Sequence, residues 1–157
     1  MTTVNNLKEL EKLINQKIAK ALADDVAETV KDVMQEKVQT EVYDAYTSHS
    51  DHPDKYVRRG MQGGLQDRKN MKSEVIDNTL IVENKTRMAD TGYELSGLVE
   101  YGNNAGYGSY DYPLAKNSEG SFLKPRPFIS ETRLEVSKGK AEDALKRGLK
   151  KQGLSVE

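Results

Sequence analysis

The stretch His49-Ser50-Asp51-His52 holds the residue types most able to do chemistry in this chain. Histidine and aspartate bind metals, and serine, histidine and aspartate together form hydrolytic triads. The spacing argues against both uses, because metal ligands on a helix stand four residues apart and triad members come from distant segments of the chain. The sequence favours a solvated turn, closed by Pro53. A hydrolase centred on His49 and His52 stays as an alternative.

Two other patterns suggest phosphate binding or acid–base catalysis. Gly60, Gly63 and Gly64 are not followed by the Gly-Lys-Ser/Thr of a phosphate-binding loop, so they favour a tight turn or close backbone packing. Asp24 and Asp25 fall on an exposed face of a predicted helix, which does not set up a catalytic acid and base. The chain has no cysteine. We therefore expect no enzyme activity, no metal site and no cofactor.

A local cluster of cations is the best candidate for a nucleic-acid surface. It consists of Arg58, Arg59, Arg68, Lys69 and Lys72. Several cations on one surface are enough to bind phosphates, but acidic residues dilute this cluster and no aromatic residue interleaves with it. A small nucleic-acid-associated module that uses Arg58 to Lys72 is therefore an alternative function. If the chain forms a ring, Arg58, Arg59, Arg68 and Lys69 are candidates to face a DNA channel.

Composition bounds the kind of protein. The 157 residues fit one domain, residues 1–157, and the net charge of −1 gives no general attraction to nucleic acid or membrane. No apolar stretch approaches the roughly 20 residues that a membrane span needs. We expect a protein made and kept in a cytosol, or built into a particle there.

The N-terminal segment, residues 1–47, predicts one long helix or two helices joined end to end. Asn6 and Glu9 form a capping pair, and no glycine or proline follows until after Tyr46. Every fourth residue is apolar: Leu10, Ile14, Ile18, Leu22, Val26, Val30, Met34, Val38 and Val42. Four residues exceed one helical turn by about 40°, so this stripe wraps around a straight helix. We expect either a break near Ala23-Asp24-Asp25 or cover from neighbouring subunits.

Residues 56–157 predict an α+β core. Residues 72–76 and 79–83 read as a hairpin turning at Asp77-Asn78, and residues 95–101 as a further strand or a short helix running into one, with residues 98–101 as a buried strand. The sheet is expected to be mostly antiparallel, with three to five strands. A C-terminal helix is expected to begin near Pro127, reach about Lys151, change phase at Gly139 and pack on the sheet. Residues 103–121 are expected to form a long loop.

Two features suggest surfaces that contact other subunits. Tyr101, Tyr107, Tyr110 and Tyr112 fall within twelve residues, and tyrosine supplies stiff amphipathic contact area at interfaces. The second half of the N-terminal helix is acidic and the C-terminal helix is basic. We expect these opposite charges to attract each other between subunits, and the tyrosine loop to protrude and touch its neighbours.

The order of several short motifs resembles the tail-completion and head-tail joining proteins of tailed bacteriophages. The motifs are the long N-terminal helix, the Gly-Gly-Leu of residues 63–65, Leu80-Ile81-Val82, Leu98-Val99-Glu100-Tyr101-Gly102 and Pro125-Arg126-Pro127-Phe128-Ile129. The resemblance covers about residues 56–150. Arg58-Arg59-Gly60 departs from the Arg-Thr-Gly type of turn that is more frequent in that family.

Membership would imply a non-catalytic virion protein at the phage neck, assembled in the host bacterial cytoplasm. It would form a ring of copies of itself, hexameric by the resemblance, between a head-side connector or stopper and the tail tube or terminator. DNA would pass through its channel, and no membrane would be involved. The candidate interface residues are Glu100, Tyr101, Tyr107, Tyr110, Tyr112, Arg126 and Phe128. Completion and terminator roles, and phage and tail-like bacteriocin, stay open.

Overall fold

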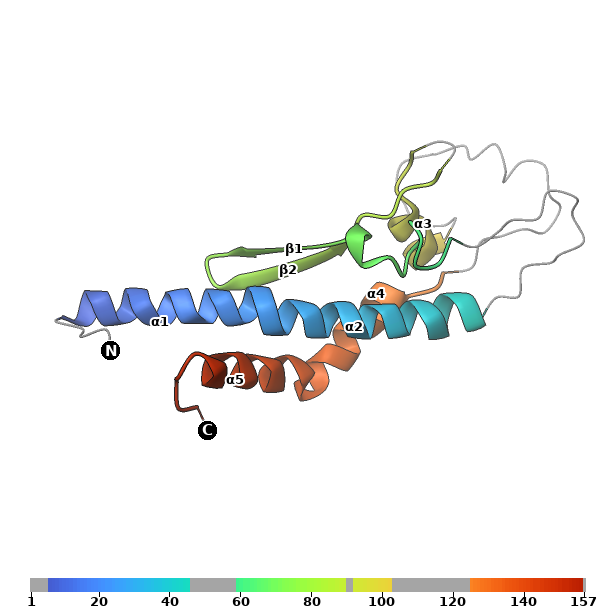
Figure 1. The fold of residues 1–157 in the computed structure, drawn as a ribbon. Helices are drawn as coiled ribbons and strands as arrows, with labels where there is room; N and C mark the ends of the chain where they lie inside the picture. Colours follow the sequence, from blue (N-terminus) through green and yellow to red (C-terminus); the bar gives the residue numbers. More distant parts are fainter. Residues whose placement is uncertain (1–5, 46–58, 90–91, 103–124, 157) are drawn as a thin grey trace, which may run out of the picture.

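An almost unbroken helical rod runs the length of the molecule (Figure 1). The computed structural model describes residues 6–45, 59–89, 92–102 and 125–156. The rod consists of α1 (Leu7–Ala21), a π-helical segment (Leu22–Val26), α2 (Ala27–Lys37) and a second π-helical segment (Val38–Asp44). Asn6 caps it, because its side-chain Oδ1 accepts a hydrogen bond from the Glu9 N–H at 2.9 Å.

The π-helical segments explain how the rod accommodates an apolar residue at every fourth position. Their hydrogen bonds span five residues instead of four, so each turn takes up more residues than an α-helical turn. Val26, Met34, Val38 and Val42 are all buried as a result. The break predicted near Ala23-Asp24-Asp25 is thus a change of winding within a continuous helix.

The predicted hairpin is confirmed, and it lies along the rod (Figure 1). Strands β1 (Met71–Ile76) and β2 (Thr79–Asn84) pair antiparallel, with Ile76 opposite Thr79. Asp77 and Asn78 form the two-residue turn with φ of 47° and 59°. Positive φ at both positions is the signature of a type I′ turn, whose twist matches that of the strands.

The sheet is smaller than the sequence suggested, since only two strands are found in the described part of the chain. The expected strand at residues 98–101 is wrong, because Leu95–Tyr101 is the short helix α3. Ser96, Val99 and Glu100 are its buried residues, and spacings of three and four place them on one helical face. Gly102, with φ of 67°, ends the helix.

The C-terminal helix bends where the sequence changes phase. Helix α4 (Phe128–Glu135) begins directly after Pro127, and α5 (Ala141–Lys151) follows a kink at Val136–Lys140. Gly139 has φ of 105° in that kink, a conformation that favours glycine. The kink lets α4 pack on α2 while α5 turns back along α1.

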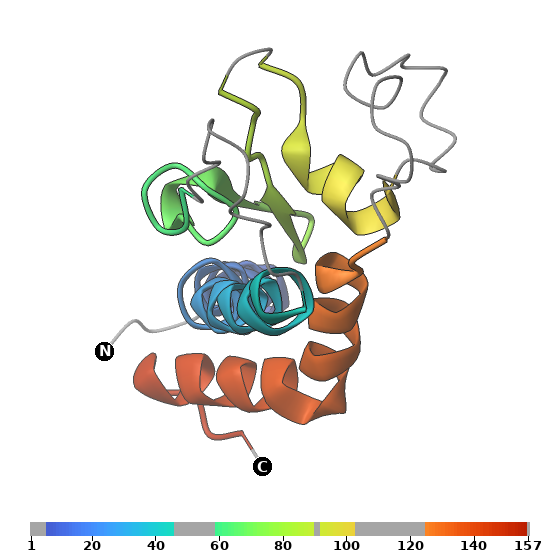
Figure 2. The ribbon, with the colours of Figure 1, turned by 90° about the vertical axis from the view of Figure 1, so that its right-hand side faces the viewer.

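The expectation that the C-terminal helix packs on the sheet is therefore wrong for α5. The rod lies between the hairpin and α5 (Figures 1 and 2). Gly148 is the reason that α5 approaches the rod so closely, since a Cβ there would lie 2.8 Å from the Ala21 Cβ. The main core lies further along the rod and comprises Met34, Val38, Val42, Leu65, Met71, Val99 and Phe128.

Candidate functional site

The buried carboxylate of Glu100 joins α3 to the first turn of α4. It is 2% exposed and accepts hydrogen bonds from the N–H of Ile129 at 2.7 Å and of Ser130 at 2.9 Å. The Ser130 hydroxyl donates a third, at 2.5 Å. The first N–H groups of a helix have no partner within it, and they carry partial positive charge that favours an anion. Glu100 thus caps α4 from another helix, an arrangement that we call the Glu100 clamp.

The clamp also holds together the two chain ends from which residues 103–124 depart. The Arg126 N–H donates to the Val99 carbonyl at 2.9 Å, next to the clamp. Gly102 and Pro125 flank the segment that contains Tyr107, Tyr110 and Tyr112, and those three tyrosines lie outside the described residues. The tyrosine segment therefore starts and ends at a fixed, closed base.

The candidate interface residues separate into two kinds. Glu100 and Phe128 are enclosed within their own subunit, at 2% and 0% exposure, so they act in capping and in the core. Tyr101 is 50% exposed. Arg126 is half-buried. Sequence reasoning assigned Glu100 and Phe128 to an interface because a short motif carries no information about burial.

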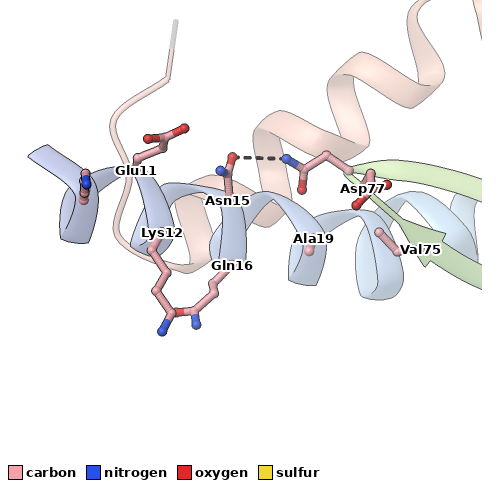
Figure 3. Close-up of a pocket in the computed structure, with 9 residues that line it drawn as sticks. Glu11, Lys12, Asn15, Gln16, Ala19, Val75 and Asp77 are labelled. Carbon is pink, nitrogen blue, oxygen red and sulfur yellow. Dashed lines mark hydrogen bonds between the residues drawn. The ribbon is translucent and has the colours of Figure 1, made fainter.

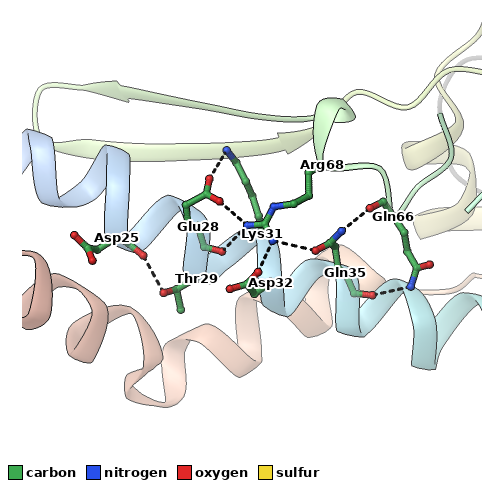
Figure 4. A network of polar contacts seen from close by, with 8 residues as sticks. All are labelled: Asp25, Glu28, Thr29, Lys31, Asp32, Gln35, Gln66 and Arg68. Carbon is green, nitrogen blue, oxygen red and sulfur yellow. Dashed lines mark hydrogen bonds and ion pairs between the residues drawn. The ribbon is translucent and has the colours of Figure 1, made fainter. Parts of the chain in front are cut away.

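The candidate channel-facing cations do not form one free patch. Arg58 lies outside the described residues, and the Arg59 guanidinium donates to the Arg87 carbonyl. Arg68 ion-pairs with Glu28 at 2.6 Å and with Asp32 (Figure 4). Lys69 is exposed.

Arg68 is the centre of a group of polar side chains that attaches the turn before β1 to the rod. We call this group the polar seam, and it comprises Glu28, Asp32, Gln35, Gln66 and Arg68. Besides its two ion pairs, Arg68 donates to the Gln35 side chain at 3.1 Å. The hydrogen bond with Asp32 raises the pKa of Arg68, and the hydrogen bond from Lys31 lowers the pKa of Glu28. These charges stabilise the fold and are not directed at a ligand.

Gln66 completes the polar seam. The Gln35 side chain donates to the Gln66 carbonyl at 2.7 Å, and Gln66 returns a bond to the Gln35 carbonyl at 3.2 Å (Figure 4). Because Gln66 is 9% exposed, these bonds satisfy polar groups that water barely reaches.

The opposite charges of the two terminal helices meet inside one subunit. Lys151 of α5 ion-pairs with Asp25, whose side chain is 14% exposed. The Lys17 ammonium donates to the Gln152 carbonyl at 2.6 Å, and the Gln152 side chain donates back to the Lys17 carbonyl at 2.9 Å. One of the expected opposite-charge pairs, Lys151 with Asp25, thus lies within a single subunit.

An open groove of about 530 Å³ lies between α1 and the tip of the hairpin (Figure 3). Seven of its nine lining residues are polar or charged, and Val75 lines it on the strand side. The Asn78 side chain reaches across to Asn15 at 3.1 Å. The groove lining comprises Lys8, Glu11, Lys12, Asn15, Gln16, Ala19, Val75, Asp77 and Asn78. No sequence motif marked it, because it arises from the hairpin folding back over a helix 60 residues away.

Apolar side chains are exposed near the same end of the molecule. Leu7 is 84% exposed, and Leu10 and Ile14 follow on the same side of α1 at 41% and 37%. On the hairpin, Ile76 and Ile81 are 48% and 42% exposed. The first part of the wrapped apolar stripe is therefore left uncovered by the described residues of the subunit.

Metal-binding clusters and membrane-spanning helices are both absent from the described residues. These residues contain no cluster of three or more His, Cys, Asp or Glu side chains placed to hold a metal ion. His49 and His52 lie outside the described residues. Among the described helices, none is both long enough and apolar enough to cross a membrane.

Comparison with known proteins gives a match to a protein family. A family model described as YomN matches residues 6–151, which is nearly the whole chain and includes the rod, the hairpin, the Glu100 clamp and α5. No curated protein and no solved structure is significantly similar to the chain.

Proposed function

The chain belongs to the YomN family, and from that membership we propose that it is a structural subunit of a phage-related particle, forming a ring at the neck. A family name of this type suggests a phage-derived protein. In this proposal the ring joins a head-side connector or stopper to the tail tube or terminator. DNA passes through the ring, and the subunit performs no catalysis.

The resemblance to tail-completion and head-tail joining proteins supports the proposal through the residues that carry it. Two of the motifs lie in separate stretches, residues 98–102 and residues 125–129. The Glu100 clamp joins the two stretches directly. The motif is thus one structural unit that presents residues 103–124 from a rigid base.

The observation that carries the proposal is the surface that one subunit leaves uncovered. Leu7, Ile76 and Ile81 are exposed at 84%, 48% and 42%. Leu7 lies at the start of α1, and Ile76 and Ile81 share the outward face of the hairpin. Exposed apolar surface of this kind is typical of protein–protein contacts. A ring of identical subunits needs such complementary faces on every copy.

The geometry gives less support to a free-standing nucleic-acid module. Such a module needs cations that are free to neutralise phosphates. Arg68 is instead committed to Glu28 and Asp32 in the polar seam, and Arg59 donates to the backbone of Arg87. Lys69 and Lys72 are left as exposed cations of the described cluster, and two charges bind phosphates weakly.

The proposal is tested by following the chain through purification of the particles made by its host. Particles are banded on a density gradient, and the chain is quantified against the major tube protein by mass spectrometry. We expect it to co-purify with intact particles at a low, constant ratio. A chain that stays entirely in the soluble fraction, with particles complete without it, would overturn the proposal.

A further inference from the structure

The hairpin presents a row of backbone hydrogen-bonding groups along each of its two edges. In a hairpin with a two-residue turn, Ile76 and Thr79 exchange hydrogen bonds, and so does every second pair beyond them. The intervening residues direct their N–H and C=O groups outward, namely Ser73 and Val75 on β1 and Leu80 and Val82 on β2. These four residues make no hydrogen bond outside the hairpin in the part of the chain that the structure describes.

We infer that β1 of one copy pairs antiparallel with β2 of the next copy, so that neighbouring hairpins join into one continuous sheet. The inference rests on the proposed ring and names its subunit interface. Each hairpin has two different edges, so the contact is head-to-tail and repeats from copy to copy. Such a contact closes into a ring when the rotation between copies permits.

The backbone supports pairing between copies in the register that the hairpin itself uses. In that register, Ser73 lies opposite Val82 of the next copy, and Val75 lies opposite Leu80 of the next copy. These are the residues whose N–H and C=O groups point outward, so they exchange the new hydrogen bonds. The alternation of inner and outer faces continues unchanged across the junction.

The outward side chains select this register. Lys72 lies opposite Glu83 of the next copy, and within the described residues Lys72 has no ion-pair partner. A slip by two residues in one direction would put Glu74 opposite Glu83 and Lys72 opposite Lys85, and like charges directly opposite are destabilising. A slip in the other direction would leave Lys72 opposite Ile81. The hairpin register therefore pairs the charges correctly.

Burial and spacing agree with the same arrangement. Ile76 and Ile81, half-exposed on the outward face, gain a neighbouring strand. Two strands span about 9.6 Å, which sets the repeat between neighbouring copies along such a sheet. The groove beside Val75 leaves space along β1 near the hairpin tip.

Disulfide trapping tests the register, because the natural chain has no cysteine. Glu74 and Ile81 already face each other within a hairpin, so the two substitutions must be on separate chains. E74C and I81C chains are co-expressed in the particle-producing host, and particles are analysed on a non-reducing gel. Between copies, Glu74 and Ile81 form a non-hydrogen-bonded pair, and the side chains of such a pair lie closer together than those of a hydrogen-bonded pair. When the two chains mix at random, about half of the E74C chains have an I81C chain on the β1 side, so we expect about half of the chain as disulfide-linked dimers.

The matched control is E74C with T79C, which is two residues out of register and too distant to bridge. The co-expressed E74C and T79C chains should not form dimers above background, and the same holds for each single variant alone. A chain that is present in particles but gives no E74C–I81C dimer would overturn the inference and leave the proposed function standing. A chain absent from all particles would overturn the proposed function, and the inference with it.

A charge exchange gives an independent measurement. K72E alone and E83K alone should each reduce incorporation into particles, because each places like charges across the junction. Co-expression of K72E with E83K restores opposite charges between neighbouring chains while leaving like charges within each hairpin. We expect incorporation to recover on co-expression. Equal incorporation of all variants, or no recovery in the mixture, would contradict the pairing.

Discussion

Glu100 and Ser130 lie 30 residues apart in sequence, yet the Glu100 carboxylate accepts hydrogen bonds from both the backbone N–H and the hydroxyl of Ser130. The two residues belong to the motifs that resemble neck proteins. Their contact shows that these motifs form an internal clamp that closes the base of residues 103–124. In the proposed ring, the surface available to partners lies at the α1–hairpin end.

Replacing Glu100 with glutamine should destabilise the subunit. The amide has one oxygen instead of two and adds two donors that face the N–H groups of α4, and buried donors left unpaired cost about 1–3 kcal/mol. Urea denaturation of E100Q measures the loss in the free energy of unfolding. The control is E142Q on an exposed part of α5, where the side chain is 68% exposed. Equal stability of E100Q and the natural chain would show that the clamp is not formed.

Phe128 and Tyr101 should respond differently to truncation. Phe128 is fully buried, so F128A should cost about 3–5 kcal/mol of stability. Tyr101 is 50% exposed, so Y101A should leave the thermal midpoint nearly unchanged and reduce incorporation into particles. Calorimetry and particle composition separate the two effects. Unfolding of Y101A at ambient temperature would mean that Tyr101 belongs to the core.

Gly148 should resist even alanine. The new Cβ would lie 2.8 Å from both the Ala21 Cβ and the Asp25 Oδ2, and overpacking costs about 1–3 kcal/mol. This exceeds the roughly 1 kcal/mol that alanine gains over glycine in a helix. The control is G97A in α3, where the nearest atom lies 3.8 Å away, so that gain should appear as a stabilisation. G148A more stable than the natural chain would contradict the close helix contact.

Arg68 should contribute to stability in a salt-dependent way. R68A removes two ion pairs that are partly exposed to solvent, and such pairs contribute about 0.2–1 kcal/mol each at low salt. The neighbouring exposed Lys69 provides the control, since K69A should have a smaller effect. Thermal unfolding at low and high salt measures the difference. An R68A variant that matches K69A at low salt would rule out a stabilising polar seam.

Acid should weaken the kink between α4 and α5. Lys138 and then Lys140 hydrogen-bond to Glu135 and lower its pKa from 4.5 to about 2. Because the folded state favours the ionised carboxylate, its contribution is complete above pH 4.5 and is lost as the pH falls towards 2. E135Q should therefore be less stable than the natural chain near neutral pH, with a smaller loss of stability over that acid range. Parallel stability curves for the two proteins would disprove this.

Local patterns predicted the elements that depend on neighbouring residues. Asn6 with Glu9 marked the start of the rod, Asp77-Asn78 marked the hairpin turn, and Gly139 marked the kink, because capping and positive φ are short-range effects. The apolar residue at every fourth position is the sequence pattern that the two π-helical segments accommodate. From sequence alone, this pattern predicted a break in the helix or cover from other subunits.

Long-range relationships were the ones that sequence reasoning missed. Residues 98–101 read as a strand because a short apolar run does not distinguish a strand from a helix. Glu100 looked like a surface carboxylate, since its donors are 29 and 30 residues away. The contact of Lys151 with Asp25 was not predicted, because it depends on the angle of the kink before α5, and no local sequence pattern specifies that angle.

The account's central claim is tested most directly by a cryo-electron microscopy reconstruction of the head-tail junction of the host's particles. It predicts a closed ring of this chain around the DNA channel, into which the rod, the hairpin and the Glu100 clamp fit as one rigid unit. A junction whose density is fully explained by other proteins would contradict it.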